Sequence, residues 1–110
     1  MDYFETSEVL NRMAAITSAQ SEIVAYNNDL DKYVTGDLLH EFSASGISVI
    51  DGRISGGNVM RAASIYYHKI REAFGERAFN LLEEMHARGY DVRMDMNTYK
   101  LVWKGVYKNV

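Results

Sequence analysis

The chain has 110 residues, of which 47% are hydrophobic and 25% charged, the composition of an ordinary globular protein. It contains no cysteine, which excludes disulfides, thiol nucleophiles and thiolate metal sites. No segment approaches the roughly 18 apolar residues that a membrane span needs, and no secretory signal follows Met1. We therefore expect one cytoplasmic globular domain, residues 1–110, without membrane contact.

Charge is distributed unevenly along the chain, although the formal net charge is only −3. Residues 1–50 contain eight acidic and two basic residues, whereas residues 51–110 contain seven acidic and ten basic residues. Such polarity either steers a partner onto one face of the protein or pairs the two halves within one fold. We favour pairing within the fold, and the partner-binding alternative stays open.

Residues 2–35 have the spacing of an amphipathic helix. Asp2 and Glu5 resemble a capping box at its start, and Thr6 or Ser7 is the alternative cap. Apolar residues then recur every three or four positions, namely Val9, Met13, Ile16, Ile23, Tyr26, Leu30 and Tyr33. The polar run at residues 27–29 is a candidate break, so the sequence is compatible with one bent helix or two shorter ones.

A short helix and a small hairpin are expected next. Asp37 is placed to cap the helix, Gly46 lies just beyond its end, and its buried edge comprises Leu38, Leu39 and Phe42. Asp51-Gly52 suits a type I′ turn, so residues 47–55 form either a short hairpin or a structured loop. Gly56-Gly57 is then a flexible joint, and Asn58 is a good N-cap for the following helix.

A second long helix is predicted from Val59 to Arg88, because its apolar positions stay in phase across Gly75. One helix of up to about 45 Å results at 1.5 Å per residue. Alternatively Gly75 divides it in two, since a glycine within a helix costs about 1 kcal/mol relative to alanine. Gly89 is well placed to end the helix as the C′ residue.

The segment from Gly89 to Tyr107 predicts a β-hairpin, because apolar and polar residues alternate on either side of a two-residue turn at Asn97-Thr98. In that register one face carries the pairs Met96–Tyr99, Met94–Leu101 and Val92–Trp103. The other face carries the ion pairs Asp95–Lys100 and Asp91–Lys104. An isolated hairpin is only marginally stable, so we expect an α+β fold in which the N-terminal helical region and one long or two shorter central helices pack on the hairpin.

No catalytic or cofactor-binding motif is recognised, and we expect a non-enzymatic protein without cofactor or metal. The three histidines, His40, His68 and His86, lack the spacing of a metal site. Asp91 and Asp95 opposite two lysines resemble a magnesium-dependent nuclease site, but the pairing that fixes the register accounts for the same residues. A nuclease and a small-ligand binder are therefore less favoured classes.

Three surfaces are candidates for binding. The acidic face of the first helix is the predicted partner-binding surface, with Glu5, Glu8, Glu22, Asp29 and Asp31. The last strand offers alternative nucleic-acid contacts at Lys100, Lys104 and Lys108. On a strand these lysines and the neighbouring aromatic residues face opposite sides, whereas nucleic-acid readers use both on one side. The open hairpin edge is a third surface, where a second copy or a partner strand would pair.

We therefore predict a small protein-interaction module that binds and occludes a larger protein or nucleoprotein complex, with its acidic helix face as the candidate surface. In size and charge it is comparable to inhibitors carried by phages and other mobile elements and to bacterial immunity proteins, although no shared motif carries that comparison. The alternative is a small nucleic-acid-binding regulator that uses the basic half of the chain.

Overall fold

The computed structural model describes residues 3–47, 49–50, 53–54 and 59–107, with side chains for residues 7–47 and 59–107. Its elements in chain order are α1 (Tyr3–Thr35), α2 (Asp37–Ala44), β1 (Val49–Ile50), β2 (Arg53–Ile54), α3 (Val59–Ala87), β3 (Tyr90–Met94) and β4 (Leu101–Val106). The strands form two separate antiparallel hairpins, β1–β2 and β3–β4. The predicted α+β class is confirmed.

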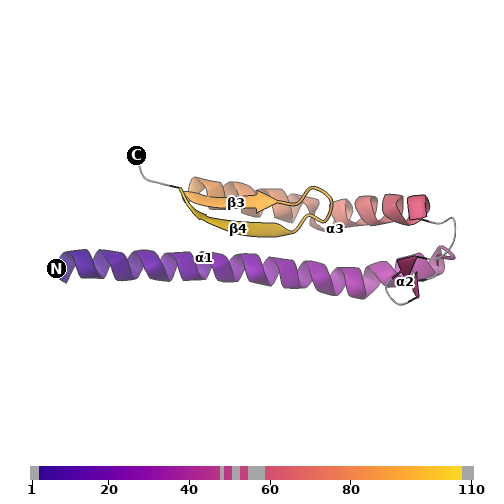
Figure 1. Ribbon diagram of the computed structural model, residues 1–110, viewed down its shortest axis with the longest axis horizontal. Helices are drawn as coiled ribbons and strands as arrows, with labels where there is room; N and C mark the ends of the chain where they lie inside the picture. The colour runs from indigo at the N-terminus through magenta and orange to yellow at the C-terminus, as the bar shows by residue number, and fades with distance from the viewer. Residues whose placement is uncertain (1–2, 48, 51–52, 55–58, 108–110) are drawn as a thin grey trace.

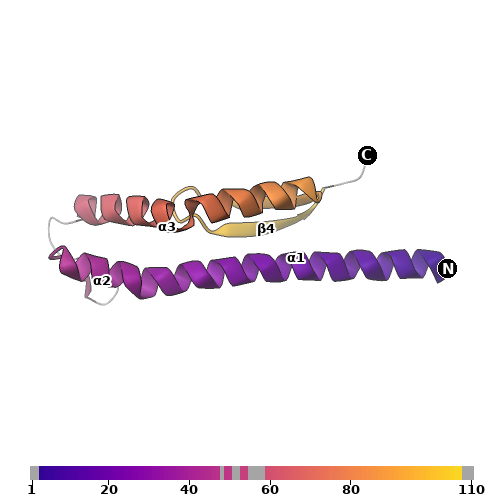
Figure 2. The same cartoon turned by 180° about the vertical axis from the view of Figure 1, so that it is seen from behind.

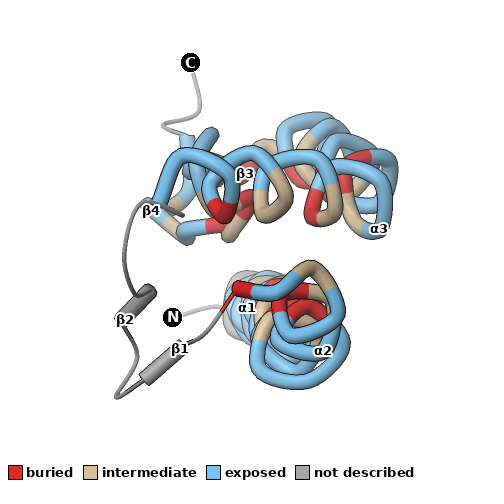
Figure 3. The backbone as a smooth tube through the Cα atoms, turned by 90° about the vertical axis from the view of Figure 1, so that its right-hand side faces the viewer, coloured by how far each residue is buried: buried red, intermediate tan, exposed pale blue. Residues whose placement is uncertain are grey.

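The molecule is elongated and measures 65 × 23 × 19 Å along its principal axes. Its radius of gyration is 18.8 Å, compared with about 13 Å for a compact chain of this length. Helix α1 runs along the long axis, and α3 and the β3–β4 hairpin lie over it (Figures 1 and 2). Seen along that axis, β4, β3 and α3 stand side by side in one layer, and α1 and α2 form the other (Figure 3).

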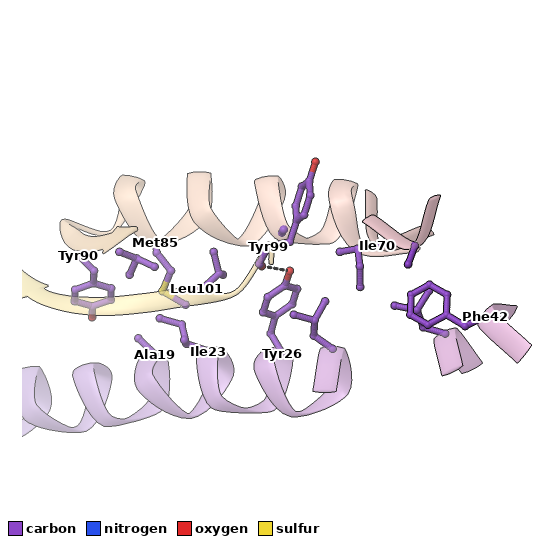
Figure 4. Packing of buried hydrophobic residues seen from close by; sticks show 14 of the residues in the cluster. Ala19, Ile23, Tyr26, Phe42, Ile70, Met85, Tyr90, Tyr99 and Leu101 are labelled. Carbon is purple, nitrogen blue, oxygen red and sulfur yellow. Dashed lines mark hydrogen bonds between the residues drawn. The ribbon is translucent and has the colours of Figure 1, made fainter. Parts of the chain in front are cut away.

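One hydrophobic core fills the space between these layers. Its largest fully buried side chains come from all three helices and the hairpin: Tyr26, Tyr99, Leu30, Leu38, Ile70, Met85 and Val92. Figure 4 shows side chains of α1 directed toward those of α3 and the hairpin. Burial of this apolar surface is the main source of stability. Within the described residues, neither long helix is apolar over a length sufficient to cross a membrane.

Helix α1 is continuous through residues 27–29, so a break there does not occur. The side chain of Asn27 does not compete for its own helix backbone, because it is hydrogen-bonded to β4. The predicted apolar stripe packs against the core from Ile16 onward, whereas Val9 and Met13 are exposed. The N-terminal part of α1 extends past the hairpin and α3 (Figure 1).

Helix α2 follows a turn and ends in a glycine cap. Gly36 occupies its N-cap in place of the predicted Asp37, and no side chain caps this end. Gly46 has a φ of +78°, which glycine adopts readily, and the Ile47 N–H donates to the Phe42 carbonyl oxygen at 2.9 Å. The predicted buried edge is confirmed at two of three positions, because Leu38 and Phe42 are buried and Leu39 is exposed.

The predicted hairpin within residues 47–55 is present as β1 and β2. Val49 pairs with Ile54, and Ile50 pairs with Arg53. The expected turn at residues 51–52 and the expected joint and N-cap at residues 56–58 lie outside the described residues.

Helix α3 is a single helix of 29 residues, and Gly75 does not divide it. Because one glycine costs far less than the packing of a whole helix face contributes, the helix continues through it. Gly89 follows α3 with a φ of +90°, as expected of a residue that ends a helix.

We expect Gly75→Ala to raise the free energy of unfolding by about 0.5–1 kcal/mol, because alanine favours the helix and restricts the unfolded chain. The nearest atom to an added Cβ is the Arg71 Cγ at 3.4 Å, an ordinary van der Waals contact. Urea denaturation measures the change. Gly89→Ala is the matched control and should destabilise, since its backbone has positive φ. Equal effects of the two substitutions would contradict this explanation.

The β3–β4 hairpin has the predicted register in its central part. Met94 pairs with Leu101 and Val92 with Trp103. Val92 and Leu101 are buried, as expected of the covered face. Trp103 is partly buried and packs against Tyr90, with 5.0 Å between the ring centroids.

The predicted two-residue turn at Asn97-Thr98 is wrong, because Asp95 closes a longer loop over residues 96–99. One oxygen of the Asp95 carboxylate accepts from the N–H groups of residues 97 and 98 at 2.8 and 3.3 Å. The Asp95 carbonyl oxygen accepts from the Tyr99 N–H at 2.7 Å. Tyr99 adopts a φ of +62° and is buried, so it does not share a face with the exposed Met96.

The predicted Asp91–Lys104 ion pair is also wrong, because the register shifts between Asp91 and Val92. Asp91 lies opposite Gly105 instead. Its carboxylate accepts a hydrogen bond from the Arg93 Nε at 2.7 Å, and this interaction lowers the pKa of Asp91. The bulge thus separates the two residues that an unbroken ladder would bring together.

Candidate functional site

Three of the five acids predicted to bind a partner form ion pairs between the two halves of the chain. Glu22 pairs with Arg88 at 2.8 Å, Asp29 with Arg77 at 2.9 Å, and Asp31 with Lys100 at 2.8 Å. Their side chains are about half exposed, so each pair contributes little to stability. Together the pairs chiefly orient α1 against the layer that contains α3, β3 and β4. Glu8 is exposed, and the side chain of Glu5 lies outside the described part.

The predicted nucleic-acid contacts are not equivalent. The hydrogen bond from the Lys100 ammonium to Asp31 raises the pKa of Lys100. The predicted ion pair of Lys100 with Asp95 does not form, and only their backbones are joined, with the Asp95 N–H donating to the Lys100 carbonyl oxygen at 2.9 Å. Lys104 is exposed, and Lys108 lies outside the described residues.

Two aromatic residues of the same segment, Tyr99 and Trp103, pack on the protein itself, whereas Tyr107 is exposed. The Tyr99 ring lies near the rings of Tyr67 and Phe79, with 6.4 and 6.3 Å between centroids. Tyr99 is buried and Trp103 is partly buried. Because Tyr99 is buried, it does not offer the free ring face that base stacking requires.

His86 and the hairpin carboxylates have local partners. His86 Nε2 lies 2.7 Å from the Val92 carbonyl oxygen, Asp91 is bound to Arg93, and Asp95 caps its loop. Among the described residues, no three histidine or acidic side chains lie close enough to hold a metal ion. The pattern that resembled a magnesium site is therefore explained by hydrogen bonds within the hairpin.

Side chains from the helices occupy part of both hairpin edges. On β4, the Asn27 amide donates to the Leu101 carbonyl oxygen at 2.8 Å and accepts from the Leu101 N–H at 3.0 Å. On β3, His86 Nε2 contacts the Val92 carbonyl oxygen, which is directed away from β4. An added strand would have to displace these bonds, so at these positions the edge is already protected.

Tyr26, a residue of α1, is hydrogen-bonded to the hairpin loop. Its hydroxyl donates to the Tyr99 carbonyl oxygen at 2.6 Å within the core, the dashed line in Figure 4. Burial raises the pKa of Tyr26 to about 12, which keeps the hydroxyl protonated and able to donate. The Arg77 guanidinium lies over the Tyr26 ring, 5.4 Å from its centre.

A groove with a volume of about 630 Å³ lies between α1 and α3. Four carboxylates line it, those of Glu22, Glu72, Glu76 and Glu84, together with the guanidinium of Arg77. Small or apolar side chains complete much of the lining, including Ala25, Ala73 and Leu81. Among the described side chains, Arg88 pairs with both Glu22 and Glu84, so the unpaired negative charge of the groove is that of Glu72 and Glu76. The groove therefore combines negative charge with apolar surface, a combination suited to basic side chains.

Sequence reasoning did not identify this groove. Its only sequence signal is the four-residue spacing of Glu72 and Glu76, which places both on one face of α3. Glu22 lies across the groove from these two acids because α1 packs beside α3. The spacing of residues along the sequence does not reveal that packing.

Compared with protein-family models, with curated proteins and with solved structures, the chain has no significant match.

Proposed function

We propose that this protein is a non-enzymatic interaction module that binds a basic segment of a larger protein or nucleoprotein complex in the groove between α1 and α3. The observation that supports this proposal is the charge of the groove, which four carboxylates line and in which Glu72 and Glu76 are left unpaired by the described side chains. On this proposal the protein acts in the cytoplasm, by occluding a basic surface of its target.

Lysine or arginine side chains fit the chemistry of the groove. Their aliphatic stems pack on residues such as Ala25, Ala73 and Leu81, while their charged ends reach the carboxylates. Glu72 and Glu76 are exposed and make no ion pair among the described side chains. They are available to a partner, so the acidic surface that we propose lies on α3 as well as α1.

The double variant Glu72→Gln/Glu76→Gln should bind the partner at least about tenfold more weakly, because two unpaired charges of the groove are removed. Affinity capture from a lysate of the native host identifies the partner, and titration with the purified partner measures the affinity. Asp37→Asn/Glu83→Gln removes two exposed charges outside the groove and is the matched control.

Unchanged affinity of the Glu72→Gln/Glu76→Gln variant would contradict the groove as the binding site. Capture is repeated after nuclease treatment, because recovery that then disappears would favour the nucleic-acid-binding alternative. In that case Lys104→Glu, at an exposed position of β4, should weaken binding and reduce its dependence on salt.

A further inference from the structure

The N-terminal part of α1 carries an apolar patch that the rest of the described chain does not cover. We call residues 8–15 of α1 the arm, and all of them are exposed. Figure 1 shows this end of α1 beyond the hairpin and α3. Val9, Leu10 and Met13 are 45, 60 and 58% exposed and lie on one side of the helix. Apolar side chains gathered in this way are typical of an interface.

The charges of the arm lie along one flank of this patch. Glu8 and Arg12 are four residues apart, one helical turn, and both are exposed beside Val9. Neither makes an ion pair among the described side chains. The other flank, beyond Leu10, carries Ala14. The arm thus has a charged flank and an uncharged flank.

We propose that the arm pairs with the arm of a second copy of this chain in an antiparallel dimer. In an antiparallel pair of helices, each flank faces the same flank of the other helix, whereas in a parallel pair it faces the opposite flank. Only the antiparallel arrangement brings the two charged flanks together. With the two-fold axis at Leu10, Glu8 of each copy lies beside Arg12 of the other. This self-complementarity of charge identifies a second copy as the occupant.

The position of the hairpin on α1 limits the length over which the two α1 helices of the dimer overlap. A two-fold axis at residue 10 places residue 3 of one helix beside residue 17 of the other, a distance of about 22 Å along the helix at 1.5 Å per residue. Ala19 is the first fully buried residue of α1 in the described chain. The overlap therefore ends where each helix meets its own hairpin. An interface of this length is small, so we expect a dissociation constant in the micromolar range.

Analytical ultracentrifugation of the full chain, at concentrations from about 5 to 500 μM, tests the dimer. The average mass should rise with concentration from 12.5 kDa toward twice that value. A mass that stays at 12.5 kDa over the whole range would overturn the proposal.

An exchange of charges tests the antiparallel arrangement. Glu8→Arg alone, or Arg12→Glu alone, places like charges at both contacts and should weaken self-association at least about tenfold. An equimolar mixture of the two variants restores opposite charges, and should form a heterodimer with the affinity of the unmodified protein. Lys32→Glu, at an exposed position near the other end of α1, is the control and should leave self-association unchanged.

Because residues 8 and 12 are exposed, the circular dichroism spectrum of each variant should match that of the unmodified protein. Single variants that dimerise as strongly as the unmodified protein would overturn the proposal, as would a mixture that remains monomeric. These measurements involve no residue of the groove, so their outcome is independent of the proposed partner.

Discussion

Replacing Tyr26 with alanine should lower the free energy of unfolding by about 3–5 kcal/mol, the cost of removing a large buried aromatic side chain. Tyr26 is fully buried, and its ring packs edge-on against Phe74 with 6.1 Å between centroids. Urea denaturation measures the effect. Trp103→Ala is the comparison and should cost less, because Trp103 is only partly buried. A loss below about 1 kcal/mol for Tyr26→Ala would show that Tyr26 is not a central residue of the core.

Tyr26→Phe isolates the contribution of the hydroxyl group. It should cost about 1–3 kcal/mol, because the Tyr99 carbonyl oxygen loses its buried donor while the ring contacts remain.

The unmodified protein and the Tyr26→Phe variant should differ in how their stability responds to alkaline pH. Burial raises the pKa of Tyr26 to about 12, so the folded protein holds this proton more tightly than the unfolded chain, where tyrosine titrates near 10. The resulting stability is complete below pH 10 and is lost as the pH rises toward 12. The unmodified protein should therefore lose more stability than Tyr26→Phe over this interval. Equal losses would show that Tyr26 does not titrate in this way.

Asn27→Ala should lower the free energy of unfolding by about 1–3 kcal/mol, because both hydrogen bonds of its amide to the Leu101 backbone are lost. The amide hydrogen of Leu101 should then exchange with solvent faster, which hydrogen exchange detects directly. Asn28→Ala, at the adjacent exposed position, is the matched control. The same stability and exchange rate in both variants would mean that Asn27 does not hold β4 against α1.

Long patterns in the sequence predicted structure better than local polar signals did. The phase of the apolar positions across Gly75 allowed a single helix, and α3 is one helix because its packing outweighs the cost of one glycine. The polar run at residues 27–29 suggested a break, but Asn27 has its hydrogen-bond partners on β4. Asp95 likewise caps a loop of its own, so the hairpin turn is longer than the alternation predicted.

The candidate site was predictable only in its general character. The acidic and basic halves of the chain indicated pairing within the fold, and the three ion pairs of Glu22, Asp29 and Asp31 confirm it. Which acid meets which base depends on how α1 lies beside α3, and periodicity does not contain that information. For the same reason, the acids of α3 that line the groove were not recognised as neighbours of Glu22.

The packing of the last hairpin on the first helix has a consequence for protein synthesis. Helix α1 leaves the ribosome before the hairpin does, yet Tyr26 and Asn27 find partners 73 and 74 residues later in the chain. Contacts between such distant residues form late and slow the folding reaction. Until β4 has emerged, the part of α1 that packs on the hairpin has no cover, and during that interval it is a natural binding surface for chaperones.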